Sequence, residues 1–159
     1  MSAYETTIAA ELAACGVPAD AVRLTRPRRL FAAVERSLFD TIYHHAREKL
    51  GFIFLAAITG LDEGETFGIV YHLARQDGIM LNLKIAVPRA EATIATVTRD
   101  YPGAEIFERE LVDLFGIRVE GLPPGKRYPL PDDWPDGEYP LRKDWKPSTG
   151  KSNAEASHA

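Results

Sequence analysis

Three carboxylates stand close together at Glu108, Glu110 and Asp113. Grouped carboxylates raise one another's pKa and hard cations prefer oxygen ligands, so such a group could form an acid-base pair or a metal site. In a helix, however, Glu108 and Glu110 do not share a face. Arg109 and Asp113 are helical neighbours that can neutralise each other, and Arg109 follows Glu105 in the favourable order for an ion pair. We therefore expect an ion network that fixes geometry, with a free-standing carboxylate-dependent enzyme as the remote alternative.

Other residues that carry chemistry are sparse. The histidines are His44, His45, His72 and His158, and none has cysteine partners at the spacing of a zinc site. We expect His72 to have a packing or hydrogen-bonding role on a strand. No glycine-rich loop of the phosphate-binding type joins a predicted strand to a predicted helix. The sequence therefore predicts no catalytic residue, no cofactor and no metal on this chain.

The composition limits the classes of protein and of partner. The chain has 159 residues, 45% of them hydrophobic, which suits one globular domain with its own core. A net charge of -4 with both signs interspersed argues against nucleic acid and anionic membranes as primary partners. The single cysteine, Cys15, cannot form an internal disulfide, and the apolar run at residues 52–58 is too short to span a bilayer. We expect a reducing, cytoplasmic setting without direct membrane insertion.

Capping and periodicity predict the helices that carry these residues. Ser2 and Glu5 have the spacing of a capping box, and Ser37 begins a second segment of the same kind. Gly16 and Gly116 can supply the left-handed residue that ends a helix. Together with apolar stripes at helical spacing, these signals predict helices over residues 2–16, 37–51 and 102–115. Residues 90–97 have a helix-compatible composition, which predicts a further helix there.

Apolar runs of strand length predict a sheet. Residues 52–59 form a continuous apolar run, and residues 67–73 and 79–87 alternate between apolar and polar. The turns between these runs are too short for a parallel crossover, so the three strands must pair antiparallel. We interpret residues 28–35 as an edge strand. The expected fold class is α/β (α+β), with a mixed, largely antiparallel sheet of about four strands and helices packed on it.

The composition changes beyond Gly116. Seven of the eleven prolines fall in the last 43 residues, which argues against regular structure there. Such a segment should stay mobile unless another surface orders it. Its aromatic residues are candidate anchors for a partner, namely Tyr128, Trp134, Tyr139 and Trp145. We divide the chain into an α/β domain (1–116), an extended, proline-rich partner-binding tail (117–146) and a disordered end (147–159).

The last helix and the tail resemble a known family. The matching positions are Glu108, Arg109, Glu110, Asp113, Gly116, Ile117, Gly121, 130–134 and 140–144. Their pattern closely resembles the hydrophilic 30-kilodalton-type subunit of respiratory complex I, which is the C-type subunit of NADH-quinone oxidoreductases. The same family includes the counterpart subunit of membrane-bound, energy-converting nickel-iron hydrogenases. We refer to these positions as the signature.

The resemblance implies a peripheral subunit without a redox centre of its own, held on the cytoplasmic side of the membrane by its complex. Its partners would be the large catalytic subunit, of the nickel-iron hydrogenase or the 49-kilodalton complex I type, and a neighbouring iron-sulfur subunit. Iron-sulfur clusters and any nickel-iron site would lie on those partners. Partner-binding or structural roles are implied for Glu108, Arg109, Glu110, Asp113, Trp134, Arg142, Lys143 and Asp144.

Some positions depart from the complex I pattern. Ile106 stands where tryptophan is common, Val119 replaces an aromatic residue, and Gly121-Leu122-Pro123 replaces Gly-His-Pro. The compact length of the chain and the sequence of residues 131–145 look more like hydrogenase-type members, which favours that branch. The alternative is the equivalent subunit of an NADH- or ferredoxin-quinone oxidoreductase. A third hypothesis is an assembly module that binds the large subunit only transiently.

Overall fold

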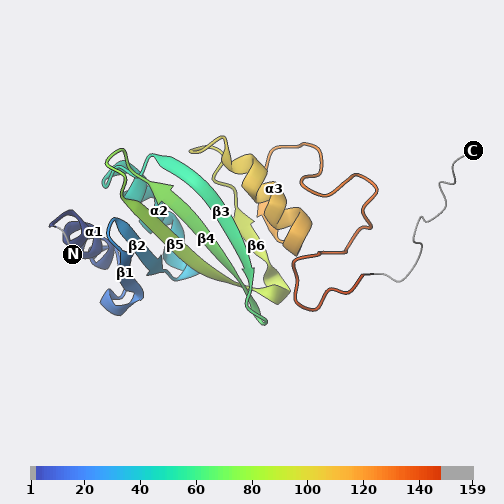
Figure 1. The fold of residues 1–159 in the computed structure, drawn as a ribbon, viewed down its shortest axis with the longest axis horizontal. Helices are drawn as coiled ribbons and strands as arrows, with labels where there is room; N and C mark the ends of the chain where they lie inside the picture. The colour runs from blue at the N-terminus through green and yellow to red at the C-terminus, as the bar shows by residue number, and fades with distance from the viewer. Residues whose placement is uncertain (1–2, 148–159) are drawn as a thin grey trace, which may run out of the picture.

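A five-stranded sheet with the order β1-β2-β5-β4-β3 is the centre of the fold, and a two-stranded sheet joins β6 to β7 (Figure 1). The computed structural model describes residues 3–147. The strands are β1 (Val22–Arg26), β2 (Arg29–Ala33), β3 (Phe54–Asp62), β4 (Thr66–Ala74), β5 (Met80–Pro88), β6 (Thr93–Ala95) and β7 (Arg118–Glu120).

The predicted meander of β3, β4 and β5 is confirmed, because β4 pairs antiparallel with both of its neighbours. The turn between β3 and β4 closes through a hydrogen bond from the Glu63 amide to the Thr66 carbonyl, 3.0 Å long. β2 instead pairs parallel with β5. The long crossover that this requires contains α2 and the first two strands of the meander. The sheet is therefore mixed and largely antiparallel, as expected.

The helices with capping signals lie where the sequence predicted them. They are α1 (Ala3–Ala14), α2 (Phe39–Glu48) and α3 (Ala104–Phe115), and shorter 3-10 turns are η1 (Ala19–Ala21), η2 (Arg36–Leu38) and η3 (Arg89–Glu91). Gly16 and Gly116 follow α1 and α3 with φ of 95° and 67°, values that glycine adopts without a steric penalty. α2 lies behind the sheet in Figure 1, and its Phe39 ring lies 4.6 Å from the Tyr71 ring of β4.

The edge of the sheet differs from the prediction. β1 forms the edge and pairs antiparallel with β2, so the interpretation of residues 28–35 as an edge strand was wrong, and the sheet has five strands. β1 carries polar Arg23 and Thr25 and buries only Val22, so it has almost no apolar pattern of its own. Pairing with β2, rather than its own sequence, makes this segment a strand.

The predicted helix over residues 90–97 was wrong. Arg89–Glu91 form the 3-10 turn η3, and Thr93–Ala95 form β6, which pairs parallel with β7. The β-branched side chains of Thr93 and Ile94 favour an extended backbone at this place. Because β7 lies at the start of the tail, the prediction of a tail without regular structure was wrong at Arg118–Glu120. The rest of the described tail contains no helix or strand.

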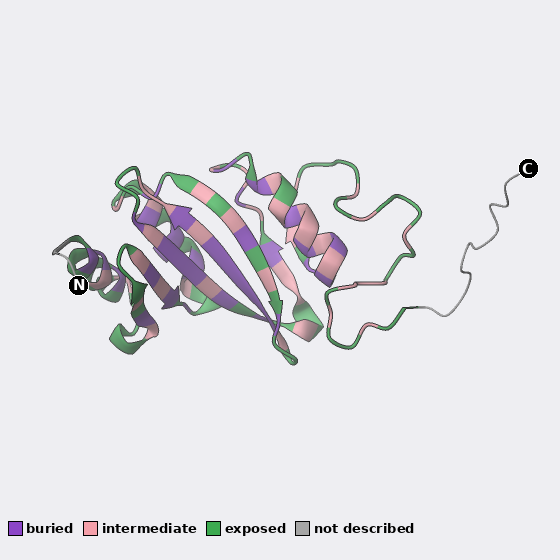
Figure 2. Cartoon of the chain, in the orientation of Figure 1, coloured by how far each residue is buried: buried purple, intermediate pink, exposed green. Residues whose placement is uncertain are grey.

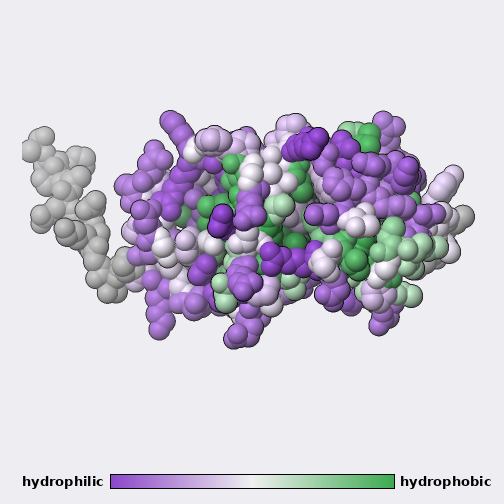
Figure 3. All heavy atoms as spheres, turned by 180° about the vertical axis from the view of Figure 1, so that it is seen from behind, coloured by the Kyte–Doolittle hydropathy of each residue, from purple (hydrophilic) through white to green (hydrophobic). Residues whose placement is uncertain are grey.

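The core lies between the main sheet and its helices. Figure 2 shows buried residues along β4 and β5 and mostly exposed or half-buried residues along the tail. From the opposite side the surface is largely hydrophilic, with smaller hydrophobic areas between (Figure 3). No helix within residues 3–147 is long and apolar enough to cross a membrane. The disorder predicted for residues 147–159 falls, except at Pro147, outside the described residues.

Candidate partner-binding site

Helix α3 carries the first half of the signature and lies along β3. Its buried Leu111 and Phe115 approach Gly60 of β3 so closely that an added Cβ would lie 2.8 Å and 2.6 Å from their side chains. Glycine at this position therefore lets the helix approach the strand. Ile106, at the beginning of the helix, is instead 51% exposed. The helix thus has one face in the core and another at the surface.

Glu108 points into the protein and is fully buried. Its carboxylate accepts hydrogen bonds from the Val97 amide at 2.7 Å and from the Thr96 hydroxyl at 2.5 Å. Burial raises the pKa of Glu108, and the two hydrogen bonds offset this only in part. Because Thr96 and Val97 directly follow β6, Glu108 joins α3 to the second sheet. In this conformation its role is structural and internal to the chain.

Arg109 makes the first contact between α3 and the tail. The predicted ion pair with Glu105 is present, with 2.8 Å between the charged atoms. The same guanidinium donates a hydrogen bond to the Pro123 carbonyl at 2.6 Å. A Cβ added to Gly125 would overlap the Arg109 guanidinium. The tail therefore passes directly over this arginine and depends on a residue without a side chain at that point.

Asp113 makes the second contact, and its partner was not predicted. It pairs with Arg127 at 3.3 Å, so the expected neutralisation of Asp113 by Arg109 was wrong. The Leu130 amide also donates to the Asp113 carboxylate at 3.4 Å, and Arg127 donates to the Trp134 carbonyl at 2.7 Å. Arg109 has Glu105 one turn earlier, whereas the Asp113 carboxylate faces the returning tail. A helix residue and a tail residue therefore hold a loop together.

Two tryptophans close the next loop of the tail around Glu138. The indole Nε1 of Trp134 donates to the Glu138 carbonyl at 2.9 Å, and that of Trp145 donates to the Glu138 carboxylate at 3.3 Å. The two rings lie 6.1 Å apart. Both tryptophans are half-buried in this chain alone. Each indole therefore keeps apolar surface that a partner could cover.

Arg142 fixes the tail against the end of α3. Its Nε donates to the Phe115 carbonyl at 2.6 Å, and the neighbouring Leu141 amide donates to the Leu114 carbonyl at 3.1 Å. The last carbonyls of a helix have no partner within the helix, so the tail satisfies two of them. The Arg142 guanidinium also lies 4.3 Å from the centre of the Tyr139 ring, which is a favourable cation-π distance.

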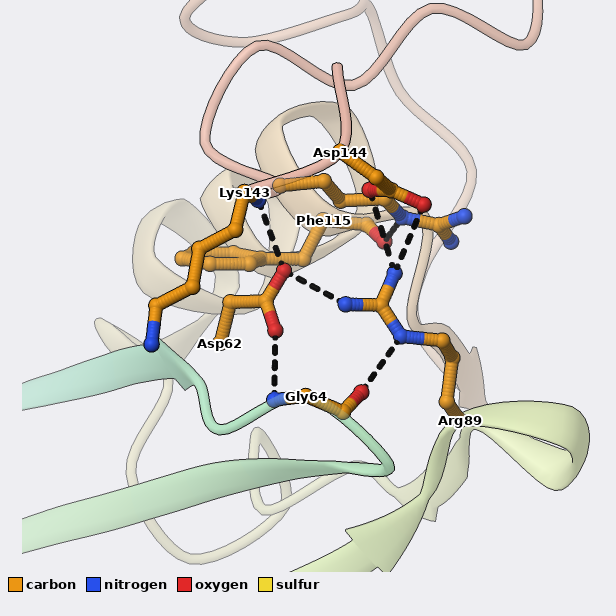
Figure 4. Close-up of polar contacts among 7 residues, drawn as sticks. Asp62, Gly64, Arg89, Phe115, Lys143 and Asp144 are labelled. Carbon is orange, nitrogen blue, oxygen red and sulfur yellow. Dashed lines mark hydrogen bonds and ion pairs between the residues drawn. The ribbon is translucent and has the colours of Figure 1, made fainter.

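Lys143 and Asp144 meet the turn between β3 and β4 (Figure 4). The Lys143 backbone amide donates to the Asp62 carboxylate at 2.8 Å. The Asp144 carboxylate lies 3.3 Å from the Arg89 guanidinium. Arg89 in turn pairs with Asp62 at 2.5 Å and donates to the Gly64 carbonyl at 2.7 Å. The end of the signature is therefore tied to the α/β domain through Asp62 and Arg89.

Sequence reasoning missed Asp62, Arg89 and Arg127 as members of this site. Asp62 ends β3, and its Oδ1 accepts a hydrogen bond from the Gly64 amide at 2.9 Å within the turn to β4. The contact of its other oxygen with Lys143 joins residues 81 positions apart, which no local pattern reveals. Arg89 and Arg127 likewise have nothing in their local sequence that separates them from other arginines.

Part of the signature stays on the surface, as does Ile106, which precedes it on α3. Ile106 is 51% exposed on α3 and Leu141 is 52% exposed on the tail. Lys143 is exposed, although its backbone is bound to Asp62. Glu110 is partly exposed, and its side chain forms no hydrogen bond or ion pair with the other residues of 3–147. These side chains are therefore accessible for contact with another protein.

The arrangement suits binding and positioning. Within residues 3–147, no group of three or more His, Cys, Asp or Glu side chains is placed to hold a metal ion. His72 has the expected hydrogen-bonding role, with its ring nitrogens 2.9 Å from the Thr59 hydroxyl and 2.6 Å from the Asn82 side-chain oxygen. The charged signature residues Arg109, Asp113 and Arg142 each bind a side chain or backbone group of this chain.

The sequence matches a family and several of its members. The family described as respiratory-chain NADH dehydrogenase, 30 Kd subunit, matches residues 32–151. The C subunit of the NADH-quinone oxidoreductase of Moorella thermoacetica is 38% identical over 106 residues, covering 65% of this chain and 70% of that protein. The C subunit of the F(420)H(2) dehydrogenase of Methanosarcina mazei is 34% identical over 123 residues, covering 76% of this chain and 77% of that protein.

Two solved structures share the fold. A trypsin-resistant fragment of Nqo5, residues 1–134 of that protein, is 30% identical with a TM-score of 0.66, covering 77% of this chain and 99% of the fragment. A chain of the membrane-bound sulfane sulfur reductase, an archaeal respiratory membrane complex, is also 30% identical, with a TM-score of 0.70. That alignment covers 79% of this chain and 76% of the other.

Proposed function

Because the chain belongs to the family of the 30-kilodalton subunit of respiratory-chain NADH dehydrogenase, we propose that it is a non-redox accessory subunit of a membrane-bound, complex-I-like oxidoreductase. It binds and braces the large catalytic subunit and lies beside an iron-sulfur subunit. Its named relatives include subunits of an NADH-quinone oxidoreductase and of an F(420)H(2) dehydrogenase. One structural neighbour is part of a respiratory membrane complex.

One observation carries this proposal, namely that the signature builds a shaped surface. Arg109, Asp113 and Arg142 hold the tail against α3, so their charges are used within the chain. The contacts of Arg142 and of the Leu141 amide with the end of α3 also fix where Leu141 lies at the surface, and Ile106 is exposed on α3 itself. A surface whose geometry is set in advance loses less conformational entropy on binding, which favours a lasting contact between subunits.

The contribution of such a subunit to catalysis is positional. By bracing the large subunit it keeps the redox centres of neighbouring subunits at the distance and orientation that electron transfer needs. Iron-sulfur clusters, and a nickel-iron site in the hydrogenase branch, belong to those partner subunits. The chain is held peripherally at the cytoplasmic side of the membrane by its partners.

Two branches of the family remain candidates for the whole complex. The amino-acid sequence of the tail from residue 131 to 145 favours the counterpart subunit of an energy-converting nickel-iron hydrogenase. The names of the relatives favour the equivalent subunit of a quinone-reducing or related dehydrogenase. The two branches differ at the large subunit, so identification of that partner decides between them.

Gentle affinity purification of the tagged chain from its native membranes tests the proposal. We expect a large subunit and an iron-sulfur subunit to be recovered in stoichiometric amounts with it. Hydrogen evolution by the eluate, with a large subunit that has paired cysteine motifs, supports the hydrogenase branch. Quinone reduction, with a large subunit that lacks those cysteines, supports the complex I branch. Recovery of the chain alone contradicts the accessory-subunit proposal, and substoichiometric recovery favours an assembly module.

A further inference from the structure

The Asp62 carboxylate lies where three segments of the chain meet (Figure 4). Its Oδ1 accepts a hydrogen bond from the Gly64 amide at 2.9 Å. Its Oδ2 accepts one from the Lys143 amide at 2.8 Å and one from the Arg89 guanidinium at 2.5 Å. Arg89 extends the contact to Asp144 at 3.3 Å. One carboxylate therefore joins the turn between β3 and β4, the segment after β5 and the end of the tail.

This carboxylate is buried but stays ionised. Its side chain is only 2% exposed. Burial alone would raise the pKa of Asp62, but the hydrogen bonds from Arg89, Lys143 and Gly64 outweigh that effect and lower the pKa to about 2. Asp62 is therefore negatively charged at neutral and mildly acidic pH, and each of its oxygens has donors. Hydrogen bonds to a charged group are stronger than those between neutral groups.

Resting on the function proposed above, we propose that Asp62 is a positioning residue, which seats the end of the tail so that Leu141 and the paired tryptophans face the partner. Asp62 acts through the tail, because its own side chain is buried beneath it. The contact between Asp62 and the Lys143 amide also determines the position of Arg142, which precedes Lys143 and binds the end of α3. Asp62 lies outside the signature, so neither the motif nor its spacing identifies it.

The two oxygens of Asp62 allow the tail contact to be separated from the turn. In Asp62→Asn, the amide oxygen can keep the hydrogen bond from Gly64, while the NH2 group then faces the Lys143 amide and Arg89. Donors face donors, so the tail contact is lost while the turn is kept. Asp20→Asn, an exposed position on η1, removes the same charge elsewhere and serves as the matched control.

The sequence supplies its own reporter for the tail. It contains two tryptophans, Trp134 and Trp145, and both lie in the tail. Tryptophan emission of the full chain therefore reports the tail, while far-UV circular dichroism reports the α/β domain. We expect Asp62→Asn to shift the emission to longer wavelength and to increase quenching by acrylamide, with the circular dichroism unchanged. Asp20→Asn should match the wild type in all of these measurements.

The second arm measures the partner. Tagged wild-type chain, Asp62→Asn and Asp20→Asn are purified gently from native membranes, and the co-purified large subunit is quantified per tagged chain. We expect about a tenfold loss for Asp62→Asn and none for Asp20→Asn, since a loose tail must be ordered again on binding. Partial recovery in Asp62→Glu, which restores the charge, separates a positioning role from general destabilisation.

Two results overturn the inference. One is a tryptophan signal in Asp62→Asn that equals that of the wild type, because Asp62 then does not seat the tail. The other is a released tail with undiminished recovery of the large subunit, because the seat then has no role in binding. A wild-type chain that retrieves no large subunit is a different failure. That result contradicts the proposed function, while the fluorescence still decides whether Asp62 seats the tail.

Discussion

The Glu108 carboxylate shows how a charged residue of the signature serves the fold. It is fully buried and accepts two hydrogen bonds, from Val97 and Thr96. Removing an acceptor from a buried backbone amide costs more than the hydrogen bond contributes, because the amide is left without a partner. Glu108 therefore matters chiefly as an acceptor that holds the segment after β6 against α3, and its negative charge is a cost of burial.

Substitution of Glu108 should separate these two properties. We expect Glu108→Gln, which keeps an acceptor for Val97, to stay within about 1 kcal/mol of the wild-type free energy of unfolding at pH 7. Glu108→Ala should lose about 2 to 3 kcal/mol, because it also leaves a cavity. Urea unfolding followed by circular dichroism measures both. Equal destabilisation by the two variants would contradict the acceptor role.

The pH dependence of Glu108 has a defined sign. Its pKa is raised in the folded state, so the stabilising contribution is fully present below the ordinary pKa and is lost as pH rises through the folded pKa. The wild type should therefore lose stability relative to Glu108→Gln as the pH rises above about 4, the ordinary pKa range of a glutamate. The same unfolding curves at several pH values test this. If the wild type instead gained stability relative to Glu108→Gln as the pH rose, burial would not be the main influence on the pKa of Glu108.

At the scale of elements, the end of α3 is where helix and tail depend on each other. Gly116 has a φ of 67° and ends the helix. An added Cβ at Gly116 would also overlap Tyr139 and Arg142 of the tail. Glycine at position 116 therefore does two things: it adopts the left-handed backbone, and it leaves room for the tail. Gly51 follows α2 with a φ of 77° and has nothing within 4 Å of an added Cβ. Glycine at position 51 therefore serves only the left-handed backbone.

This pair gives a matched test of how tightly the tail is docked. Gly51→Ala should cost about 1 kcal/mol, the usual penalty for a left-handed alanine. Gly116→Ala should cost at least about 1 kcal/mol more and should also shift the tryptophan emission, because the tail must move away. Urea unfolding and fluorescence of both variants check this. Identical behaviour would contradict the close docking of the tail against Gly116.

The sequence predicted the elements whose signals are local. Gly16 and Gly116 mark helix ends, and alternation marks β4 and β5, because these patterns depend on neighbours within one segment. It did not predict β1 or β6, whose pairing with distant strands overrides weak patterns of their own. The site was half predictable for the same reason. The proline-rich, aromatic composition predicted that the tail binds a partner. The contact of the tail with Asp62 depends on the tertiary fold, so the sequence did not predict it.

At the scale of the whole molecule, the signature gathers at one end. The tail and α3 lie at the opposite end of the main sheet from α1 (Figure 1). The surface at the signature end combines exposed Ile106 and Leu141 with the partly exposed Glu110. A brace needs one firm contact with its partner and a rigid body behind it, and a sheet with a helix and a docked tail provides both.

The most direct test of this account compares the signature end with the opposite end. The tagged chain that carries both Ile106→Asp and Leu141→Asp is purified gently from native membranes. The tagged wild type and a control, Tyr4→Asp, are purified in the same way. Tyr4 lies on α1 and is 66% exposed, so Tyr4→Asp makes one substitution of the same kind, from an exposed apolar side chain to a charged one, at the opposite end. We predict at least a tenfold loss of co-purified large subunit for the double variant and wild-type recovery for the control, because buried apolar anchors dominate interfaces. Undiminished recovery of the large subunit with the double variant would contradict the claim that this chain binds its partner through α3 and the tail.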